Sequence, residues 1–193
     1  MKDREDYPLK KFATPQSFER WLSRNHGKAD GIRIQMARKS SGIRSINYAQ
    51  ALDIALSYGW IDGQAKSMDE QWFCQRFTPR RSRSLWSKRN RDIVARLIDE
   101  GRMQPAGQAE IDRAKSDGRW DAAYDSPANA KVPDDLAAAL EKSPQAKKFF
   151  QSLDGQNRYA ILHRLMIAKK PETRAKRLAT FVDMLREGRK LYS

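Results

Sequence analysis

The side chains best suited to bind a ligand gather between residues 76 and 91, where cations recur without an acidic residue. They are Arg76, Arg80, Arg81, Arg83, Lys88, Arg89 and Arg91. Burying unpaired cations costs much free energy, so these side chains are expected at the surface. Guanidinium groups donate paired hydrogen bonds to phosphate and carboxylate groups. The segment therefore predicts an anion-binding surface.

A helix start inside this segment adds to the prediction. Ser87 is a typical N-cap residue, which places Lys88 in the first helical turn. A cation there opposes the helix dipole, and an anion bound to it and to the free backbone N–H groups would reverse that cost. The predicted anion-binding residues are Arg76, Thr78, Arg80, Arg81, Ser87, Lys88 and Asn90. The alternative is that these cations pair with carboxylates, namely Asp62, Asp69, Glu70 and those of later helices.

Three further residues are candidates for the wall of the same pocket: Trp60, Asp62 and Trp86. Asp62 could act as an acid or base beside the arginines, although a turn residue or an ion-pair partner of Arg76 is the favoured interpretation. Trp60, Trp72 and Trp86 could stack on a ligand ring or a base. Tryptophans of a small domain more often pack in its core, which is the favoured interpretation here.

The sequence offers little for catalysis or metal binding. Cys74 is its one cysteine, and neither of its two histidines, His26 and His163, is adjacent to it in sequence. No cluster has zinc-ligand spacing, and there is no phosphate-binding glycine loop or nucleophile elbow. We therefore expect no catalytic residue, no metal and no cofactor. An enzyme acting on a phosphorylated substrate remains an alternative.

The charge balance indicates the class of partner. The formal net charge is +14 and the sequence pI is about 10.1, which favours nucleic acid, anionic lipid surfaces or phosphorylated ligands. Colloidal stability alone is the alternative. The first residues are charged and lack the apolar core of a secretory signal, and no apolar run is long enough for a membrane span. The expected compartment is the cytoplasm.

The elements that must position these residues can be predicted from hydrophobic spacing. Thr14 and Asn47 are expected to cap helices, with an alternating strand over 32–37 between them. Two more strands are predicted over 60–65 and 72–77. The predicted class is α+β, with a small three-stranded antiparallel sheet and a mostly helical C-terminal half.

The helical half divides at an irregular stretch. Helices are predicted from Ser87 to Gly101 and over 105–115, and then over 134–142, 144–152, 155–169 and 171–187. Residues 119–132 are the least regular, with a turn signature at Asp125-Ser126-Pro127. The predicted domains are therefore 1–125, with the basic and aromatic motif, and 126–193.

With these segments laid out, the chain resembles the bacterial YdeI/OmpD-associated family over residues 10 to 190. The matching segments are Gly59-Trp60-Ile61-Asp62-Gly63, Arg76 to Arg81, Ser84 to Asn90, Gly101 to Met103, Ala114 to Trp120 and Ala168 to Arg174. The resemblance implies protection against bacteriocins or cationic antimicrobial peptides, and association with an outer-membrane porin. It implies no catalytic residue or cofactor. The predicted function is a cytoplasmic binding protein for an anionic small molecule or phosphate-bearing ligand, with a weakly sequence-specific nucleic-acid-binding module as the alternative.

Overall fold

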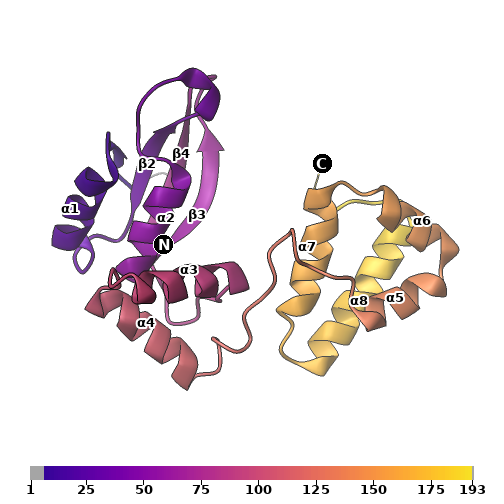
Figure 1. Ribbon diagram of the computed structural model, residues 1–193. Coiled ribbons are helices and arrows are strands. Elements are labelled where there is room, and N and C mark those ends of the chain that lie inside the picture. The colour runs from indigo at the N-terminus through magenta and orange to yellow at the C-terminus, as the bar shows by residue number, and fades with distance from the viewer. Residues whose placement is uncertain (1–6, 193) are drawn as a thin grey trace. The chain divides into compact units, whose positions relative to one another are not determined.

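A computed structural model describes residues 7–192 and divides them into two compact units (Figure 1). The first unit contains residues 7–85 and 90–121. The second contains residues 122–192 together with the short segment 86–89, so the chain enters it twice. In this segment Ser87 forms an isolated parallel bridge with Tyr124.

The first unit is built around a four-stranded mixed sheet. Its strands are β1 (Leu9–Lys11), β2 (Ile32–Ala37), β3 (Trp60–Ser67) and β4 (Trp72–Pro79), in the order β1-β2-β4-β3. β4 is antiparallel to both its neighbours, whereas β1 pairs with β2 in parallel. The α+β class is confirmed. The prediction of three antiparallel strands was wrong, because the sheet has a fourth strand, β1, which is parallel to its neighbour. All three residues of β1 are exposed, so the edge strand has no alternating apolar pattern to reveal it.

The helices of the first unit begin where the sequence predicts. They are α1 (Pro15–Asn25), α2 (Tyr48–Ser57), α3 (Lys88–Asp99) and α4 (Pro105–Ser116), with a short 3-10 turn η1 (Lys39–Ser41). Thr14 and Asn47 both form capping boxes, in which the cap side chain accepts from the third helical N–H. These reciprocal bonds satisfy backbone donors that the helix itself leaves open.

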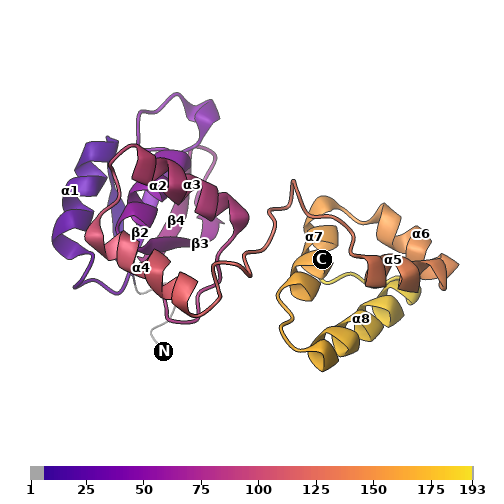
Figure 2. The same cartoon turned by 60° about the horizontal axis from the view of Figure 1, so that its bottom comes forward.

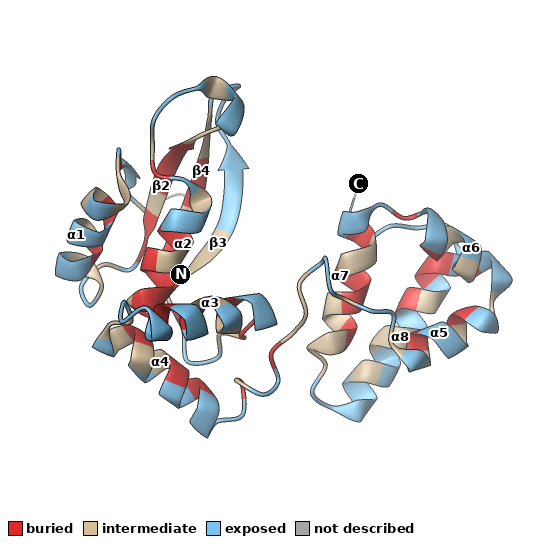
Figure 3. Cartoon of the chain, in the orientation of Figure 1, coloured by how far each residue is buried: buried red, intermediate tan, exposed pale blue. Residues whose placement is uncertain are grey.

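The core of the first unit lies between α1, α2 and one face of the sheet (Figure 3). Ile32, Ile34 and Met36 alternate along β2 and are fully buried, as period two requires. Phe77, which pairs with Ile32 across the strands, has its ring 6.0 Å from that of Phe18 on α1. Alternate residues of β2 and β4 must therefore point to the opposite face.

The first turn of α4 packs closely on the C-terminal end of α2. The backbone N–H of Gln104 donates to the Ser57 carbonyl at 3.2 Å. Gly107 lies so close to that carbonyl that an added Cβ would be 2.1 Å from the Ser57 oxygen and 2.7 Å from Met103 Sδ. The glycine permits an approach of two backbones that no side chain allows.

The second unit is a group of helices, seen in Figures 1 and 2 in two views that differ by a turn of 60°. They are α5 (Asp134–Glu141), α6 (Pro144–Ser152), α7 (Gly155–Met166) and α8 (Pro171–Arg186), and α6 and α8 each begin at the proline predicted to start them. Their shared core includes Leu136, Phe150, Ile161, Leu165, Phe181 and Leu185. The helical character predicted for this half is confirmed.

Two polar clamps hold the ends of this unit. Arg174 donates from Nε to Asp135 Oδ2 at 2.7 Å and from Nη2 to Oδ1 at 2.9 Å, and this pairing lowers the pKa of the Asp135 carboxyl. Asn157, 3% exposed, accepts from the backbone N–H groups of Leu191 and Tyr192 and donates to the Tyr192 carbonyl. The last residues described are thereby fastened to the start of α7.

His163 on α7 makes the stability of this unit depend on pH. Its ring meets that of Tyr124 edge to face at 4.6 Å, and burial, then the charge of Arg164, lowers its pKa. An unfolded histidine titrates near 6.5, so below that pH the unfolded chain binds more protons than the folded one. The stability is fully present above about pH 6.5 and is lost as the pH falls through the folded pKa.

We expect hydrogen exchange of the α7 amides to quicken between pH 7.5 and pH 5.5, after correction for intrinsic rates. His163→Gln removes the titrating group, so its stability should change less over that interval. Equal changes in the two proteins would contradict the assignment to His163.

Candidate functional site

One face of the first unit's sheet gathers cations and an aromatic ring. The register aligns Arg33 of β2 with Arg76 of β4, and Ala37 with Trp72. Lys11 of β1 aligns with Gln35 of β2, on the same face as Arg33. We call this surface the basic sheet face and define it by Lys11, Arg33, Trp72, Arg76 and Thr78. It is opposite to the face that Ile32, Ile34 and Met36 bury against the helices.

The centre of the basic sheet face is a pair of arginines. Arg33 and Arg76 lie directly opposite each other, and directly opposed like charges destabilise a sheet. Arg33 Nε donates to the Tyr7 carbonyl at 2.9 Å. Arg76 lies against Gly63, and its buried Nε has no hydrogen-bond partner among the described residues. Within residues 7–192, neither guanidinium pairs with a carboxylate.

At the start of β4, Trp72 is partly exposed. The Nζ of Lys11 lies 4.6 Å from the centre of its ring. Ala37, on β2 between the two, is small and leaves the lysine room to reach across. A cation over an indole ring is attracted by the ring's quadrupole, by about 0.5–1 kcal/mol at an exposed site.

At the other end of β4, an open cavity of about 440 Å³ adjoins the basic sheet face. Its lining residues are Tyr7, Asp30, Thr78, Pro79, Arg80 and Arg81. The Tyr7 ring lies over Gly31, where an added Cβ would be 2.7 Å from the ring and 3.0 Å from Thr78 Cγ2. Arg81 is exposed and forms no ion pair within the described chain, whereas Asp30 brings a carboxylate to the rim.

The structure thus brings together four of the residues predicted to bind an anion: Arg76, Thr78, Arg80 and Arg81. Their roles differ. Arg80 is 5% exposed, and its Nη1 donates to the Leu85 carbonyl at 3.2 Å, so it also supports the loop after β4. Arg76 and Arg81 are the more accessible donors.

The other predicted residues lie elsewhere. Trp60 and Trp86 are each 1% exposed, so their rings are core, as favoured. Asp62 accepts a hydrogen bond from Tyr48 Oη at 2.9 Å and aligns with Phe77, so it lies on the helix-covered face and does not face Arg76. The favoured interpretation was a turn residue or an ion-pair partner of Arg76, but Asp62 lies within β3 and does not pair with Arg76.

The three residues predicted at the start of α3 are placed differently again. Lys88 Nζ pairs with Asp125 at 2.9 Å, and the Lys88 backbone N–H donates to the Tyr124 carbonyl. Ser87 and Asn90 are buried. Ser87 and Lys88 group with the second unit and Asn90 with the first.

Sequence reasoning missed Tyr7, Lys11 and Arg33. The one available signal was the alternation of residues 32–37, which already places Arg33 on the polar face of its strand. Nothing in the sequence pairs that strand with Arg76, because register across strands depends on tertiary structure.

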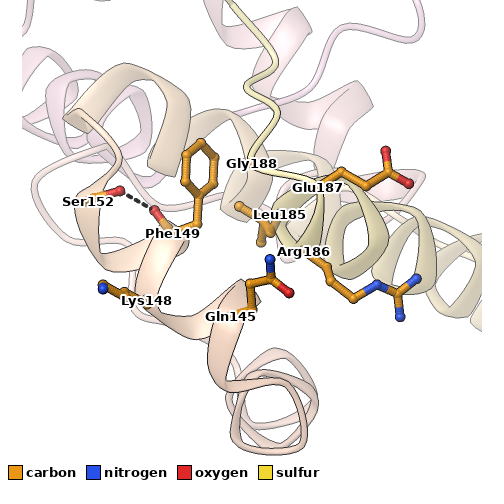
Figure 4. A pocket seen from close by; sticks show the side chains of 8 residues that line it. All are labelled: Gln145, Lys148, Phe149, Ser152, Leu185, Arg186, Glu187 and Gly188. Carbon is orange, nitrogen blue, oxygen red and sulfur yellow. Dashed lines mark hydrogen bonds between the residues drawn. The ribbon is translucent and has the colours of Figure 1, made fainter.

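The second unit has a hollow of its own, about 430 Å³, between α6 and the end of α8 (Figure 4). Phe149 and Leu185 supply apolar surface, and Gln145, Lys148, Ser152, Arg186, Glu187 and Gly188 complete the lining. Arg186 pairs with Asp183, Glu187 with Arg189, and Ser152 Oγ donates to the Phe149 carbonyl at 2.8 Å. Its charged rim is therefore largely occupied by local pairs.

Two classes of site are absent from the described part of the chain. Residues 7–192 contain no group of three or more His, Cys, Asp or Glu side chains able to hold a metal ion. None of the helices within that range combines the length and the apolar character needed to cross a membrane.

Two family models match the chain. Residues 10–110, more than half of it, match one described as a domain of unknown function (DUF8412). Residues 129–188 match one described as bacteriocin-protection, YdeI or OmpD-associated, which confirms the predicted resemblance for that segment. That second match is narrower than the predicted 10 to 190, and the motif segments from Gly59 to Met103 fall within the first. No curated protein and no solved structure matches.

Proposed function

We propose that this chain, a member of the family of unknown function DUF8412, binds an anionic, phosphate-bearing ligand on the basic sheet face of its first unit. The chain also carries a YdeI/OmpD-associated bacteriocin-protection domain at residues 129–188. The observation that carries the proposal is the alignment of Arg33 with Arg76, two guanidinium groups with no carboxylate partner within residues 7–192.

The physical argument concerns what such a pair gains from a ligand. Two opposed cations repel each other, and an anion between them turns that repulsion into two attractions. Charge-assisted hydrogen bonds from guanidinium to phosphate are shorter and stronger than neutral ones. The strands hold the backbone at both positions, so less ordering is needed when the ligand binds than on a loop.

The surroundings favour the same class of ligand. Lys11 at one end and Arg81 at the other extend the positive surface along β4. The net charge of +14 attracts anions from a distance, in a manner that salt screens. This binding would be the biochemical activity of the first unit, which matches DUF8412, and is separate from the helical second unit, which matches the bacteriocin-protection model.

The test compares two double variants of equal charge. Arg33→Ala/Arg76→Ala removes the central pair, whereas Arg20→Ala/Arg24→Ala removes two exposed arginines from α1, which packs on the other face. Binding of inorganic phosphate and pyrophosphate is measured by titration calorimetry at low salt. We expect the first variant to lose about tenfold or more in affinity, and the second about twofold or less, because direct charged hydrogen bonds contribute more than distant charge.

An equal loss in both variants would mean that net charge alone attracts the anion. No binding by the unmodified protein would also contradict the proposal. Circular dichroism and thermal unfolding of each variant establish that the fold is retained.

A further inference from the structure

We infer that the ligand of the basic sheet face is a short stretch of single-stranded nucleic acid. The inference rests on the proposed function and narrows its ligand class. It comes from the order of side chains along β4, where Trp72, Cys74, Arg76 and Thr78 share one face. Cys74 and its partner Gln35 are buried, so Trp72 and Arg76 stand on either side of a closed centre. Six residues of strand span about 20 Å, a length that suits about three extended nucleotides and exceeds a single phosphate group.

Aromatic rings mark both ends of this track. Trp72 is partly exposed at the start of β4, and the Tyr7 ring lies beside Thr78 at the cavity. Between them lie Arg33 and Arg76. Proteins that bind single strands combine a positive track for the phosphates with aromatic rings on which bases stack. The basic sheet face has both components in the required order.

Lys11 over the Trp72 ring suggests how a base would bind there. The lysine Nζ lies 4.6 Å from the ring centre. A base stacking on the same ring would displace the flexible lysine, whose charge then becomes available to a phosphate. Each base has a π face, so this contact requires no particular sequence.

The Tyr7 ring, in the same cavity as Asp30, favours a nucleic acid over a bare phosphate, because a base can stack on it. A base stacked on Tyr7 would lie within the same cavity as Asp30, while its phosphate reaches Arg33 or Arg76. A duplex would not bind in this way, because its bases already stack on one another.

The experiment measures the fluorescence anisotropy of labelled mixed-sequence octanucleotides, as single-stranded DNA, single-stranded RNA and duplex DNA, with the full chain at several salt concentrations. We expect both single strands to bind at least tenfold more tightly than duplex. The logarithm of their affinity should fall with the logarithm of salt with a slope of about −2, as for three phosphate contacts. Pyrophosphate should compete only weakly.

Two pairs of variants identify the surface. Trp72→Ala should weaken single-strand binding by about tenfold, whereas Trp72→Phe keeps a ring and should stay within about threefold. Arg33→Ala/Arg76→Ala should weaken it and flatten the salt slope, unlike Arg20→Ala/Arg24→Ala. An equal effect of Trp72→Ala and Trp72→Phe would overturn the stacking on which the inference depends.

The outcomes separate the inference from the proposed function. If phosphate or pyrophosphate binds through Arg33 and Arg76 while octanucleotides bind no more tightly, the nucleic-acid inference fails and the proposed function stands. Duplex binding as tight as single-strand binding, unaffected by Trp72→Ala, would likewise overturn the inference. If no anion binds to the unmodified chain, both fail.

Discussion

Replacing Gly107 by alanine is expected to lower the free energy of unfolding of the first unit by about 3 kcal/mol, the upper part of the range for overpacking. The added Cβ would be 2.1 Å from the Ser57 carbonyl oxygen, which is backbone and is held by the N–H of Gln104. Such a contact can be relieved only by moving α4 away from the end of α2. The loss should appear as a lower urea midpoint with little change in slope.

The sign of this effect is informative, because helix propensity alone predicts the opposite result. Alanine in a helix interior is favoured over glycine by about 1 kcal/mol. Gly27→Ala in the same unit is the matched control, since an added Cβ there meets nothing within 4 Å and its φ is not positive. We expect Gly27→Ala to be nearly neutral. Stabilisation by Gly107→Ala would show that the two helices do not approach so closely.

The second large effect is expected from Asn157→Ala, which should destabilise the second unit by about 2–3 kcal/mol. The Asn157 side chain is 3% exposed and serves the backbone N–H groups of Leu191 and Tyr192, at 3.1 and 2.9 Å, and the Tyr192 carbonyl at 3.2 Å. Its amide also donates to Asp154 Oδ2 at 2.9 Å, at the cap of α7. Removing the Asn157 side chain leaves these backbone groups without a hydrogen-bond partner at once. The free-energy cost of leaving them unsatisfied is larger than the net gain from a single hydrogen bond.

Asn129→Ala is the control for this prediction, because Asn129 is exposed in a turn of the same unit. Hydrogen exchange read by mass spectrometry separates the two variants. In Asn157→Ala the amides of Leu191 and Tyr192 should exchange at the rate of an unfolded chain, and those of α7 should lose protection. Unchanged protection in the last residues would contradict the clamp.

Local sequence signals account for much of the fold. Thr14 and Asn47 act as caps through side chains that bond within their own first turn, so neither needs a distant partner. The strand at 32–37 and the proline-started helices α6 and α8 follow from spacing and backbone chemistry in the same way. β1 was not predictable, because an exposed edge strand is defined by its pairing with β2.

The candidate site was only partly predictable, because it too depends on pairing between strands that are distant in sequence. Arg76, Thr78, Arg80 and Arg81 are close in sequence. The cost of burying cations predicts surface positions for the three arginines, which is correct for Arg81, partly correct for Arg76 and wrong for the buried Arg80. Arg33 is separated from Arg76 by the whole of α2 and β3, and only the register of β2 on β4 brings them together. Similarly, the pairing of Lys88 with Asp125 depends on a contact between distant segments.

The second unit is built from two separate segments of the chain, which matters for where the chain can be divided. Residues 86–89 group with 122–192, and Ser87 forms its bridge with Tyr124. A genetic exchange with one crossover near residue 122 would transfer the C-terminal helices without that strip. A chain of residues 122–192 alone would therefore lack the bridge between Ser87 and Tyr124.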